Sequence, residues 1–470
     1  MQKIQRWLGI LLIGILLMGG TGIMGAAPSE DRPGQLDRYL DRYQRTMVIP
    51  QMAVAVMREG ELVYSRSWGE GVDGRTRFYI GSISKSVTGL AVMQLVEQGL
   101  IDLDQPVSAY IPEFTVSDEI TVRHLLHHVS GMTEFDFAPN LPPGASRAEL
   151  VQSLNGMTPT YAPGEVFSYF NPNYSLLGYL VERISGQSYP DYLEENIFAP
   201  LGLNRFNARG RVDVIGHQSF FGFSREREEP FLVYDLPSGY IAASAEDLAR
   251  YLEAVRTRDP ALGVSEEGIQ QMESSSQVGS YGMGWFTGSY AERPSVHHGG
   301  SLPGYVSDGV MLTEDGYSIA FLANKNHMIH AVFLYPDLVE GIAAILTDQV
   351  ATDRLTLHWV YRLFGVFFVL SVLSNLWKSL KGLFFPKPMT RTWRILGMVV
   401  NLTIPVVVFF LVPYVSKAVL QRGFDWTIAF LLVPDFLLWL AIGMGFHVID
   451  ALVHGLHLLL ETGTLKKASR

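Results

Sequence analysis

The sequence predicts an α+β fold: one antiparallel sheet with flanking helices and a helical lobe, followed by a three-helix transmembrane module. Strand-like alternation of apolar and polar residues occurs early, at 52–68, and returns far along the chain, at 309–323. Helical patterns fill the region between these stretches. Strands at both ends of a segment, with helices between them, are typical of a sheet assembled from distant parts of the chain. After residue 350, long apolar stretches replace this pattern.

The first 27 residues have the composition of a secretory signal peptide or a signal anchor. Lys3 and Arg6 precede an uncharged apolar run, Trp7–Met24, and three small residues follow it. Pro28 comes directly after these small residues, and a proline at that position hinders cleavage. The sequence is therefore compatible with either a removed signal peptide or a retained anchor.

Residues 28–350 are predicted to form one extracytoplasmic domain. Two alternating runs joined by Glu59-Gly60 indicate a hairpin. The helix that starts at Ser82 should stop before Gly99, because glycine commonly ends helices. In chain order, the expected elements are a helix at 35–47, strands at 52–58 and 62–68, helices at 82–98, 122–128, 173–184 and 245–255, and strands within 309–323.

Residues 351–470 are predicted to form the transmembrane module. The apolar stretches 359–377, 395–415 and 427–447 are each close to the ~20 residues that a helix needs to cross the hydrocarbon core. The loop after the first stretch is basic, with Lys378, Lys381, Lys387, Arg391 and Arg394. Positive charge marks the cytoplasmic side of a membrane protein. We therefore expect a multi-pass cell-membrane protein with domain 28–350 extracytoplasmic and the C-terminus cytoplasmic.

The composition of residues 28–350 narrows the classes of function. This region holds 22 Lys and Arg against 41 Asp and Glu, a net charge of −19. Such acidity does not suit nucleic-acid binding, in which lysine and arginine neutralise phosphates. The chain has no cysteine, which excludes disulfides, thiol catalysis and cysteine-bound metals.

The segment Ser82-Ile83-Ser84-Lys85 places a serine and a lysine on the same face of one helical turn. Residues i and i+3 of a helix are neighbours, so the lysine amine can lie beside the serine oxygen. Lys85 is one of two lysines between residues 28 and 350, against 20 arginines. A base that must lose its proton has to be lysine, because arginine keeps its charge. The pair is a candidate nucleophile and base, although S-x-x-K alone is a weak motif.

Further motifs follow in order between Gln35 and Lys325. They are Val122-Arg123-His124-Leu125-Leu126-His127-His128-Val129-Ser130-Gly131, Pro163-Gly164, Tyr169-Phe170-Asn171, Pro200-Leu201-Gly202-Leu203, Ser244-Ala245-Glu246-Asp247-Leu248, Tyr281-Gly282-Met283-Gly284-Trp285 and His298-Gly299-Gly300. Together with S-x-x-K, their order resembles the serine β-lactamase and penicillin-binding-protein superfamily, on the branch of class C β-lactamases, D,D-peptidases and related esterases. The resemblance implies a β-lactamase/D,D-peptidase-like sheet and an acyl-transfer reaction without a cofactor.

The resemblance also implies a role for each residue that carries chemistry. Ser82, Lys85 and Tyr169 are the expected catalytic residues, with Tyr169 acting as general base and general acid. Asn171, two residues further on, can orient Lys85 or the amide of the substrate. Without the other motifs, a Tyr-Phe-Asn triplet would be interpreted as an aromatic turn in the core.

His298 and Gly300 correspond to the third motif of the family, on the strand that edges the site. The oxyanion donors would then be the backbone N–H groups of Ser82 and Ser301. Two positions depart from the lactamase pattern: His298 replaces a lysine, and Phe170 replaces a small residue. A neutral imidazole attracts a substrate carboxylate less than an ammonium group does. These departures put β-lactamase activity in doubt and leave peptidase or esterase activity open.

Two groups of histidines were considered as metal sites. His124, His127 and His128 have helical spacing, but the resemblance makes this helix structural. His447, Asp450, His454 and His457 share one helical face at the inner end of the last apolar stretch, where an interfacial polar stripe is the simpler interpretation. No metal site is expected at either place.

The sequence therefore predicts a membrane-anchored extracytoplasmic serine hydrolase that forms an acyl-enzyme on Ser82. Its order of segments also resembles that of membrane-bound D-amino-acid-specific peptidases that trim acylated prodrugs. The expected activity is that of a peptidase or amidase on D-amino-acid-containing or acylated substrates, and the expected partner is a small peptide, amide or ester. A cell-envelope D,D-carboxypeptidase or esterase is the alternative within enzymes. A sensor that is acylated once and signals through the helices is an alternative of another class. The oligomeric state is left open.

Overall fold

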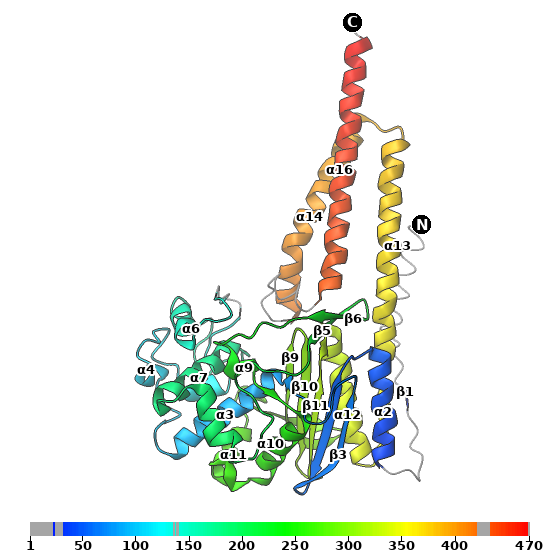
Figure 1. Ribbon diagram of the computed structural model, residues 1–470. Coiled ribbons are helices and arrows are strands. Elements are labelled where there is room, and N and C mark those ends of the chain that lie inside the picture. Colours follow the sequence, from blue (N-terminus) through cyan, green and yellow to red (C-terminus); the bar gives the residue numbers. More distant parts are fainter. Residues whose placement is uncertain (1–21, 24–31, 135–136, 138–140, 421–432, 469–470) are drawn as a thin grey trace. The chain divides into compact units, whose positions relative to one another are not determined.

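A computed structural model describes residues 22–23, 32–134, 137, 141–420 and 433–468 (Figure 1). Most of the predicted signal segment therefore lies outside the described residues. The chain divides into two compact units, of which the first comprises Met1–Ser219 and Phe223–His358 and the second comprises Phe220–Gly222 and Trp359–Arg470. The first unit is an α+β domain and the second is a helical module.

The core of the first unit is a six-stranded antiparallel sheet with the strand order β3-β2-β11-β10-β9-β8. Its strands are β2 (Met52–Arg58), β3 (Glu61–Trp68), β8 (Phe286–Tyr290), β9 (Arg293–Leu302), β10 (Tyr305–Leu312) and β11 (Tyr317–Ala323). Strands β2 and β11 pair from Met52 opposite Ala323 to Arg58 opposite Tyr317. The predicted sheet, built from distant parts of the chain, is confirmed.

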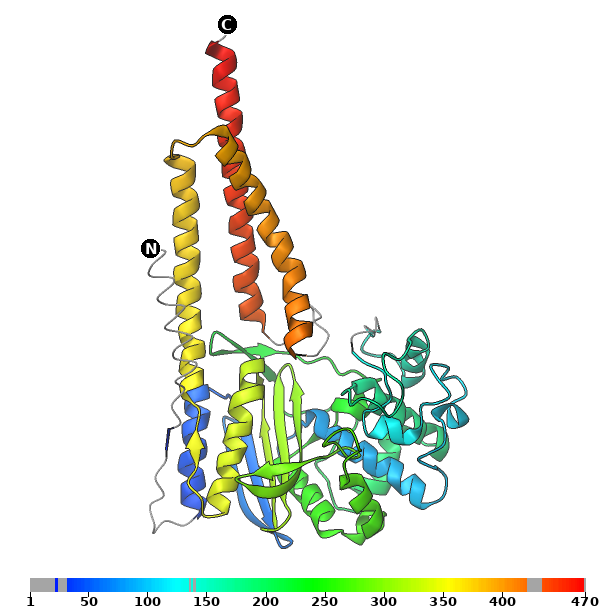
Figure 2. The same cartoon turned by 180° about the vertical axis from the view of Figure 1, so that it is seen from behind.

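Helices cover both faces of this sheet. Along β2 the side chains alternate, so that Val54 and Val56 belong to one apolar cluster and Ala53 and Ala55 to another. The first cluster includes residues of α2 (Arg32–Met47) and α12 (Tyr335–Leu346), and the second includes residues of α3 (Ser84–Glu97) and α10 (Ala245–Thr257). In Figure 2 the yellow-green helix α12 lies against the sheet. The sheet is therefore a buried central layer.

The helical lobe lies, in sequence, between β3 and β8. Its remaining helices are α4 (Val107–Tyr110), α5 (Val122–Leu126), α6 (Arg147–Leu154), α7 (Asn171–Ser185), α8 (Tyr189–Leu193), α9 (Leu236–Gly239) and α11 (Glu266–Glu273), with single turns η1 (Gly81–Ile83), η2 (Glu194–Phe198) and η3 (Pro260–Leu262). Helices α3, α7 and α9 pack against one another. This packing brings the candidate residues of three chain segments together.

Short strands complete the first unit. They are β1 (Gly22–Ile23) paired with β13 (Thr352–Asp353), β4 (Phe78–Tyr79) paired with β7 (Ala242–Ala243), and a three-stranded sheet of β12 (Lys325–Asn326), β5 (Gly216–Phe220) and β6 (Phe223–Arg227). The turn η4 (His330–Leu334) precedes α12. The β4–β7 pair matters for the site, because η1 and α3 follow β4 directly.

The predicted helix at 122–128 is shorter in the structure. Helix α5 ends at Leu126, because His128 has a φ of 56°, in the left-handed region that terminates a helix. The alternation of apolar and polar residues does not indicate β8 or β9, and a strand at His298 and Gly300 is expected only from the family resemblance. Pro294 and the Gly299-Gly300 pair interrupt any alternation there, and proline in a strand usually argues against the strand.

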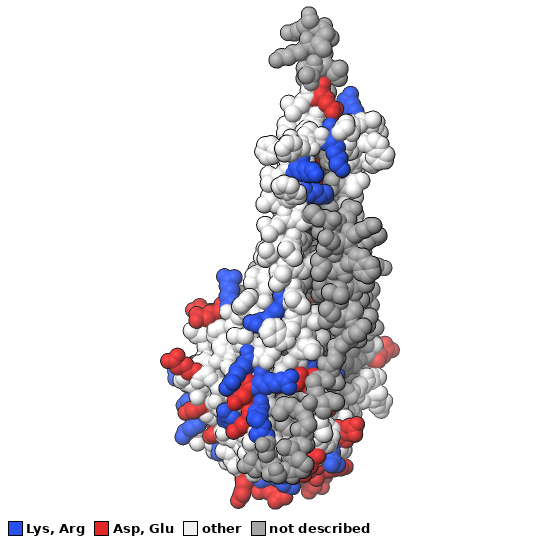
Figure 3. Space-filling model, turned by 90° about the vertical axis from the view of Figure 1, so that its right-hand side faces the viewer, with Lys and Arg blue, Asp and Glu red and all other residues white. Residues whose placement is uncertain are grey.

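Among its described residues, the second unit contains three helices that are long and apolar enough to cross a membrane. They are α13 (Thr356–Phe384), α14 (Arg391–Leu420) and α16 (Pro434–Ala468), with candidate spans Thr356–Phe384, Arg391–Leu411 and Pro434–Glu461. The surface of this module is mostly white in Figure 3, with blue side chains gathered near one end. Most of the Lys and Arg residues described in the module are the basic residues 378–394, where α13 ends and α14 begins.

Candidate active site

Ser82 lies in the single turn η1, at the start of helix α3. The residue before this turn, Ile80, is fixed on both sides. Its N–H donates to the carbonyl of Ile241 at 2.9 Å, and its carbonyl accepts from the Ser307 hydroxyl at 2.6 Å. The turn is thus fixed both to the central sheet through β10 and to the segment after α9. Ser82 itself is half-buried, which leaves part of the serine accessible.

Lys85 is fully buried, with its ammonium group beside the serine. Its Nζ donates to Ser82 Oγ at 3.2 Å and to the backbone carbonyl of Ser238 at 2.7 Å. Burial lowers the pKa of Lys85 to about 7, although the carboxylates of Asp235 and Glu134 act in the opposite direction. A lysine with such a pKa is partly neutral at pH 7. It can therefore take a proton from a serine in hydrogen-bond contact.

The Asp235 carboxyl group binds the side chain of Ser238, the residue whose backbone carbonyl accepts from Lys85. Asp235 Oδ1 accepts from the hydroxyl groups of Ser238, at 2.6 Å, and Ser175, at 2.7 Å. Burial raises the pKa of Asp235, whereas these two hydroxyl groups and Lys85 favour its charged form. The contact between Lys85 and residue 238 spans 153 positions in the sequence. No motif in the sequence analysis pointed to Ser238 or Asp235.

Tyr169 and Asn171 lie at the start of helix α7. The Lys85 Nζ lies 4.8 Å from the centre of the Tyr169 ring, so the predicted catalytic residues are neighbours. Asn171 is the first residue of α7, and its Oδ1 is buried without a hydrogen-bond partner among the described residues. A buried acceptor of this kind can receive a hydrogen bond from a ligand.

His128 also belongs to this cluster, which the sequence analysis did not foresee. Its ring lies 4.3 Å from the ring of Tyr169, and the residue is fully buried. Its Nδ1 accepts from the backbone N–H of Phe170 at 3.2 Å, so the neutral ring carries its proton on Nε2. Burial, and then the charge of Lys85, lower the pKa of His128 well below its usual value. A neutral His128 therefore fixes the backbone next to Tyr169.

His298 lies in strand β9 with both ring nitrogens paired. Its Nδ1 donates to the carbonyl of Gly299 at 2.7 Å, and its Nε2 accepts from the Tyr281 hydroxyl at 3.1 Å. Burial, and then the charge of Lys85, lower the pKa of His298 to about 3. The imidazole is consequently neutral at pH 7, and its side chain is 2% exposed. The Tyr281 hydroxyl thus holds the His298 ring in place through this hydrogen bond.

Gly300 and Ser301 place strand β9 directly against the serine turn. A Cβ on Gly300 would lie 2.1 Å from the carbonyl oxygen of Ile80, so only glycine fits there. The Ser301 hydroxyl accepts from Asn326 Nδ2 at 2.8 Å, which fixes this part of the strand. Strand β8 pairs with β9 only as far as His297. Beyond that residue, the outer edge of β9 beside the serine turn is not paired by β8.

The three histidines of the α5 motif have separate partners rather than a shared centre. His124 Nδ1 accepts from the Thr121 N–H at 3.2 Å in a capping box, and His127 Nδ1 lies 3.1 Å from the Tyr281 carbonyl oxygen. In the helical module, His447 Nδ1 lies 2.8 Å from Asn401 Oδ1. Within the described ranges, no three His, Cys, Asp or Glu residues are placed to hold a metal ion.

The chain is similar in sequence to a known protein family and to characterised bacterial proteins. A sequence model of the Beta-lactamase family matches residues 36–340. Protein flp of Staphylococcus aureus (strain N315) is 25% identical over 323 residues, which is 63% of this chain and 64% of the relative. Penicillin-binding protein 4* of Bacillus subtilis (strain 168) is 27% identical over 299 residues, 57% of this chain and 66% of the relative. The chain therefore spans less than two thirds of the length of flp.

Solved structures give the same fold. The octameric penicillin-binding protein homologue from Pyrococcus abyssi has a TM-score of 0.59 at 26% identity, covering 67% of this chain and 77% of that structure. A D-stereospecific amidohydrolase from Streptomyces sp. has a TM-score of 0.55 at 22% identity, covering 63% of this chain and 95% of that structure. At this lower identity, the likeness shows the fold alone.

Proposed function

Because this chain belongs to the beta-lactamase family, we propose that it is a membrane-anchored extracytoplasmic serine hydrolase that forms an acyl-enzyme on Ser82. One observation carries the proposal: Lys85 Nζ lies 3.2 Å from Ser82 Oγ and has a pKa of about 7. Ser82 Oγ attacks the carbonyl carbon of an amide or ester, and its proton passes to Lys85. The leaving amine or alcohol takes up a proton. Tyr169, which lies beside Lys85, acts as the general acid that donates it. Water then hydrolyses the acyl-enzyme and restores the serine.

The proposed substrate is an amide of a D-amino acid or an acylated peptide. Strand β9 has an outer edge beside Ser82 that β8 leaves unpaired after His297, where an extended peptide can add as a strand. A D-stereospecific amidohydrolase has the same fold, so the fold is compatible with this substrate class. Oxyanion stabilisation would come from the backbone N–H groups of Ser82 and Ser301.

The neutral His298 ring favours amides and esters over substrates that an enzyme recognises through their terminal carboxylate. With a pKa of about 3 and both nitrogens paired, the His298 ring supplies no positive charge near pH 7. A D,D-carboxypeptidase would gain from a fixed cation at this strand, because charge-assisted hydrogen bonds to carboxylates are the stronger ones. The D,D-carboxypeptidase is therefore the second candidate.

Turnover separates the enzyme from the sensor. The purified full chain is mixed with a panel of acyl-D-amino-acid amides, their L-isomers, D-Ala-D-Ala peptides and short-chain esters. We expect many product molecules per chain with the D-amides and no turnover by Ser82→Ala. One product molecule per chain, with a lasting acyl adduct on Ser82, would instead identify a sensor. Preferred cleavage of D-Ala-D-Ala peptides would favour the carboxypeptidase.

A further inference from the structure

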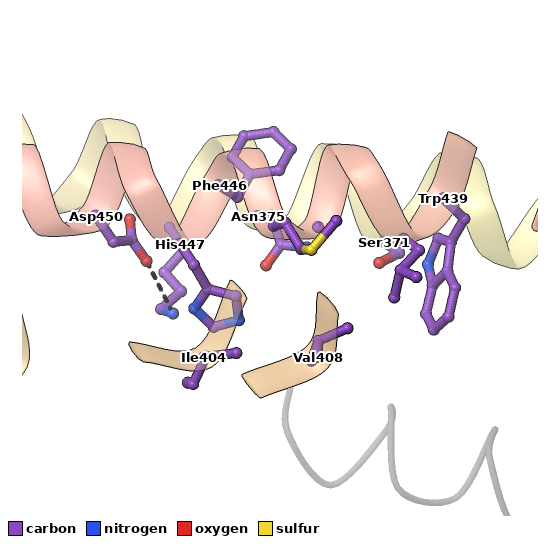
Figure 4. A pocket seen from close by; sticks show the side chains of 12 residues that line it. Ser371, Asn375, Ile404, Val408, Trp439, Phe446, His447 and Asp450 are labelled. Atoms are coloured by element: carbon purple, nitrogen blue, oxygen red, sulfur yellow. Dashed lines mark ion pairs between the residues drawn. The ribbon is translucent and has the colours of Figure 1, made fainter. Parts of the chain in front are cut away.

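A cavity of about 250 Å³ lies within the helical module, between α13, α14 and α16 (Figure 4). From α13 it is lined by Ser371, Asn375 and Lys378, which have the i, i+4, i+7 spacing of one helical face. His447 and Asp450 of α16 also line the cavity. Polar side chains are rare in membrane helices and usually mark a functional site. A polar face of this kind on a membrane-spanning helix therefore indicates that the cavity binds a ligand.

One end of the cavity carries two opposite charges. Lys378 Nζ lies 3.1 Å from Asp450 Oδ2, and the lysine side chain is 68% exposed. The Ser379 hydroxyl donates to Asp450 Oδ1 at 2.6 Å, which leaves the carboxylate oriented toward the lysine. This end thus presents an accessible ammonium group and a carboxylate side by side. It is also the end that adjoins the basic loop between α13 and α14.

Two polar side chains of α13 that line the cavity have no hydrogen-bond partner among the described residues. The side chains of Ser371 and Asn375 are half-buried and make no hydrogen bond to any residue within the described parts of the chain. An unpaired amide at the depth of the hydrocarbon core is costly, since no water is available there. The occupant of the cavity should therefore offer an acceptor at this level, such as an ester carbonyl.

The end of the cavity away from Lys378 carries a large apolar side chain. Trp439 lies at this end beside Ser371, and Val408 lies between Trp439 and Ile404 (Figure 4). A Cβ on Gly443, which also lines the cavity, would meet no atom within 4 Å. Lys378 and Ser371 are seven residues apart, which corresponds to about 10 Å along a helix. The Lys378–Asp450 pair thus lies toward one end of the cavity and Trp439 at the other, with Asn375 and Val408 between them (Figure 4).

We propose that this cavity binds one glycerophospholipid with a primary-amine headgroup, of the phosphatidylethanolamine class. Lys378 pairs with its phosphate and Asp450 with its ammonium group. Asn375 donates to an ester carbonyl, and an acyl chain lies along Val408 and Trp439. A headgroup with negative charge alone would meet repulsion from Asp450. A choline headgroup has no N–H to donate to that carboxylate.

Lipid binding to the full chain tests the proposal. The protein is purified, stripped of lipid in detergent, and titrated with phosphatidylethanolamine, phosphatidylglycerol and phosphatidylcholine of identical acyl chains, with bound lipid counted by native mass spectrometry. We expect one phosphatidylethanolamine per chain, bound about tenfold more tightly than the other two lipids. No retained lipid, or equal binding of all three, would overturn the proposal.

Two glycines of α16 provide a matched pair of variants. Gly443 and Gly445 both have open space around an added Cβ, but only Gly443 lines the cavity. Leucine favours helix more than glycine does, so neither change should disturb the fold. Gly443→Leu should abolish phosphatidylethanolamine binding, and Gly445→Leu should leave it unchanged. Equal binding to both variants would show that the lipid lies elsewhere.

A substitution at Asp450 tests the proposed pairing of this carboxylate with the amine of the lipid headgroup. Asp450→Asn keeps an acceptor for Ser379 and removes the charge that pairs with the lipid amine. The preference for phosphatidylethanolamine over phosphatidylglycerol should fall from about tenfold to within about twofold. An unchanged preference would refute the ammonium–Asp450 pair. Ser82→Ala should bind lipid like the wild type, since the site is independent of the proposed hydrolase.

Discussion

Lys85 Nζ donates hydrogen bonds to Ser82 Oγ at 3.2 Å and to the Ser238 carbonyl at 2.7 Å. The first contact joins the candidate base to the candidate nucleophile. The second joins it to the backbone carbonyl of Ser238, whose side-chain hydroxyl donates to Asp235. Burial brings the pKa of Lys85 to about 7, so the charge of this lysine changes near neutral pH.

The reactivity of Ser82 should therefore rise with pH. Lys85 can accept a proton only when it is neutral, and its neutral fraction increases as the pH passes its pKa of about 7. The rate constant for labelling by a fluorophosphonate should increase between pH 6 and pH 8, with a midpoint near 7. Lys85→Arg should lower the rate by about 10²- to 10⁴-fold at pH 8 and remove the rise with pH, because arginine stays charged. A flat wild-type profile would contradict the role of Lys85.

Gly300 should tolerate no side chain, whereas its neighbour should. A Cβ at residue 300 would lie 2.1 Å from the Ile80 carbonyl oxygen, but one at Gly299 would come no closer than 3.9 Å to any atom. Gly300→Ala should displace β9 from the serine turn, lower the free energy of unfolding by about 1–3 kcal/mol and reduce labelling of Ser82. Gly299→Ala should stay within about 0.5 kcal/mol of the wild type. Similar thermal unfolding and labelling for the two variants would argue against this packing.

The stability of the protein should depend on the hydrogen-bond acceptor that the neutral His128 ring provides. His128→Phe leaves the buried N–H of Phe170 unpaired, which should cost about 1–3 kcal/mol. His128→Asn should be milder, since asparagine offers an acceptor and tolerates the φ of 56°. Thermal unfolding of the full chain in detergent measures both. If the phenylalanine variant is the more stable of the two, Nδ1 does not hold Phe170.

The predicted orientation in the membrane can be tested directly, because the chain has no cysteine of its own. A cysteine at Pro386, in the basic loop, should resist an impermeant maleimide in intact cells and react after permeabilisation. A cysteine at Glu314, in the exposed turn between β10 and β11, should react in intact cells. Labelling of Pro386→Cys alone in intact cells would invert the topology.

The sequence predicted the sheet because β2 and β11 keep their alternation wherever they pair, and it predicted the three apolar helices by length and composition. It also named Ser82, Lys85 and Tyr169, which the structure brings together. The contact within S-x-x-K has a local cause, because residues i and i+3 lie on the same face of a helix.

Other parts of the site had no local signal. The Ser238 carbonyl that receives Lys85 is a backbone atom, and residue type carries no information about it. The place of His128 depends on its left-handed backbone and on contacts with Tyr169 and Phe170, which form only after α7 packs on α5. For His298, the sequence indicated a polar residue at the strand but not its burial.

Fluorophosphonate labelling of the wild type and Ser82→Ala is the most direct test of the central claim, that Ser82 is an activated nucleophile. Only a serine with a neighbouring base reacts rapidly with this probe, and the product is a covalent bond between phosphorus and serine Oγ. We expect one label per wild-type chain, located on Ser82 by peptide mass spectrometry, and none on Ser82→Ala. Equal labelling of the two proteins would contradict the account.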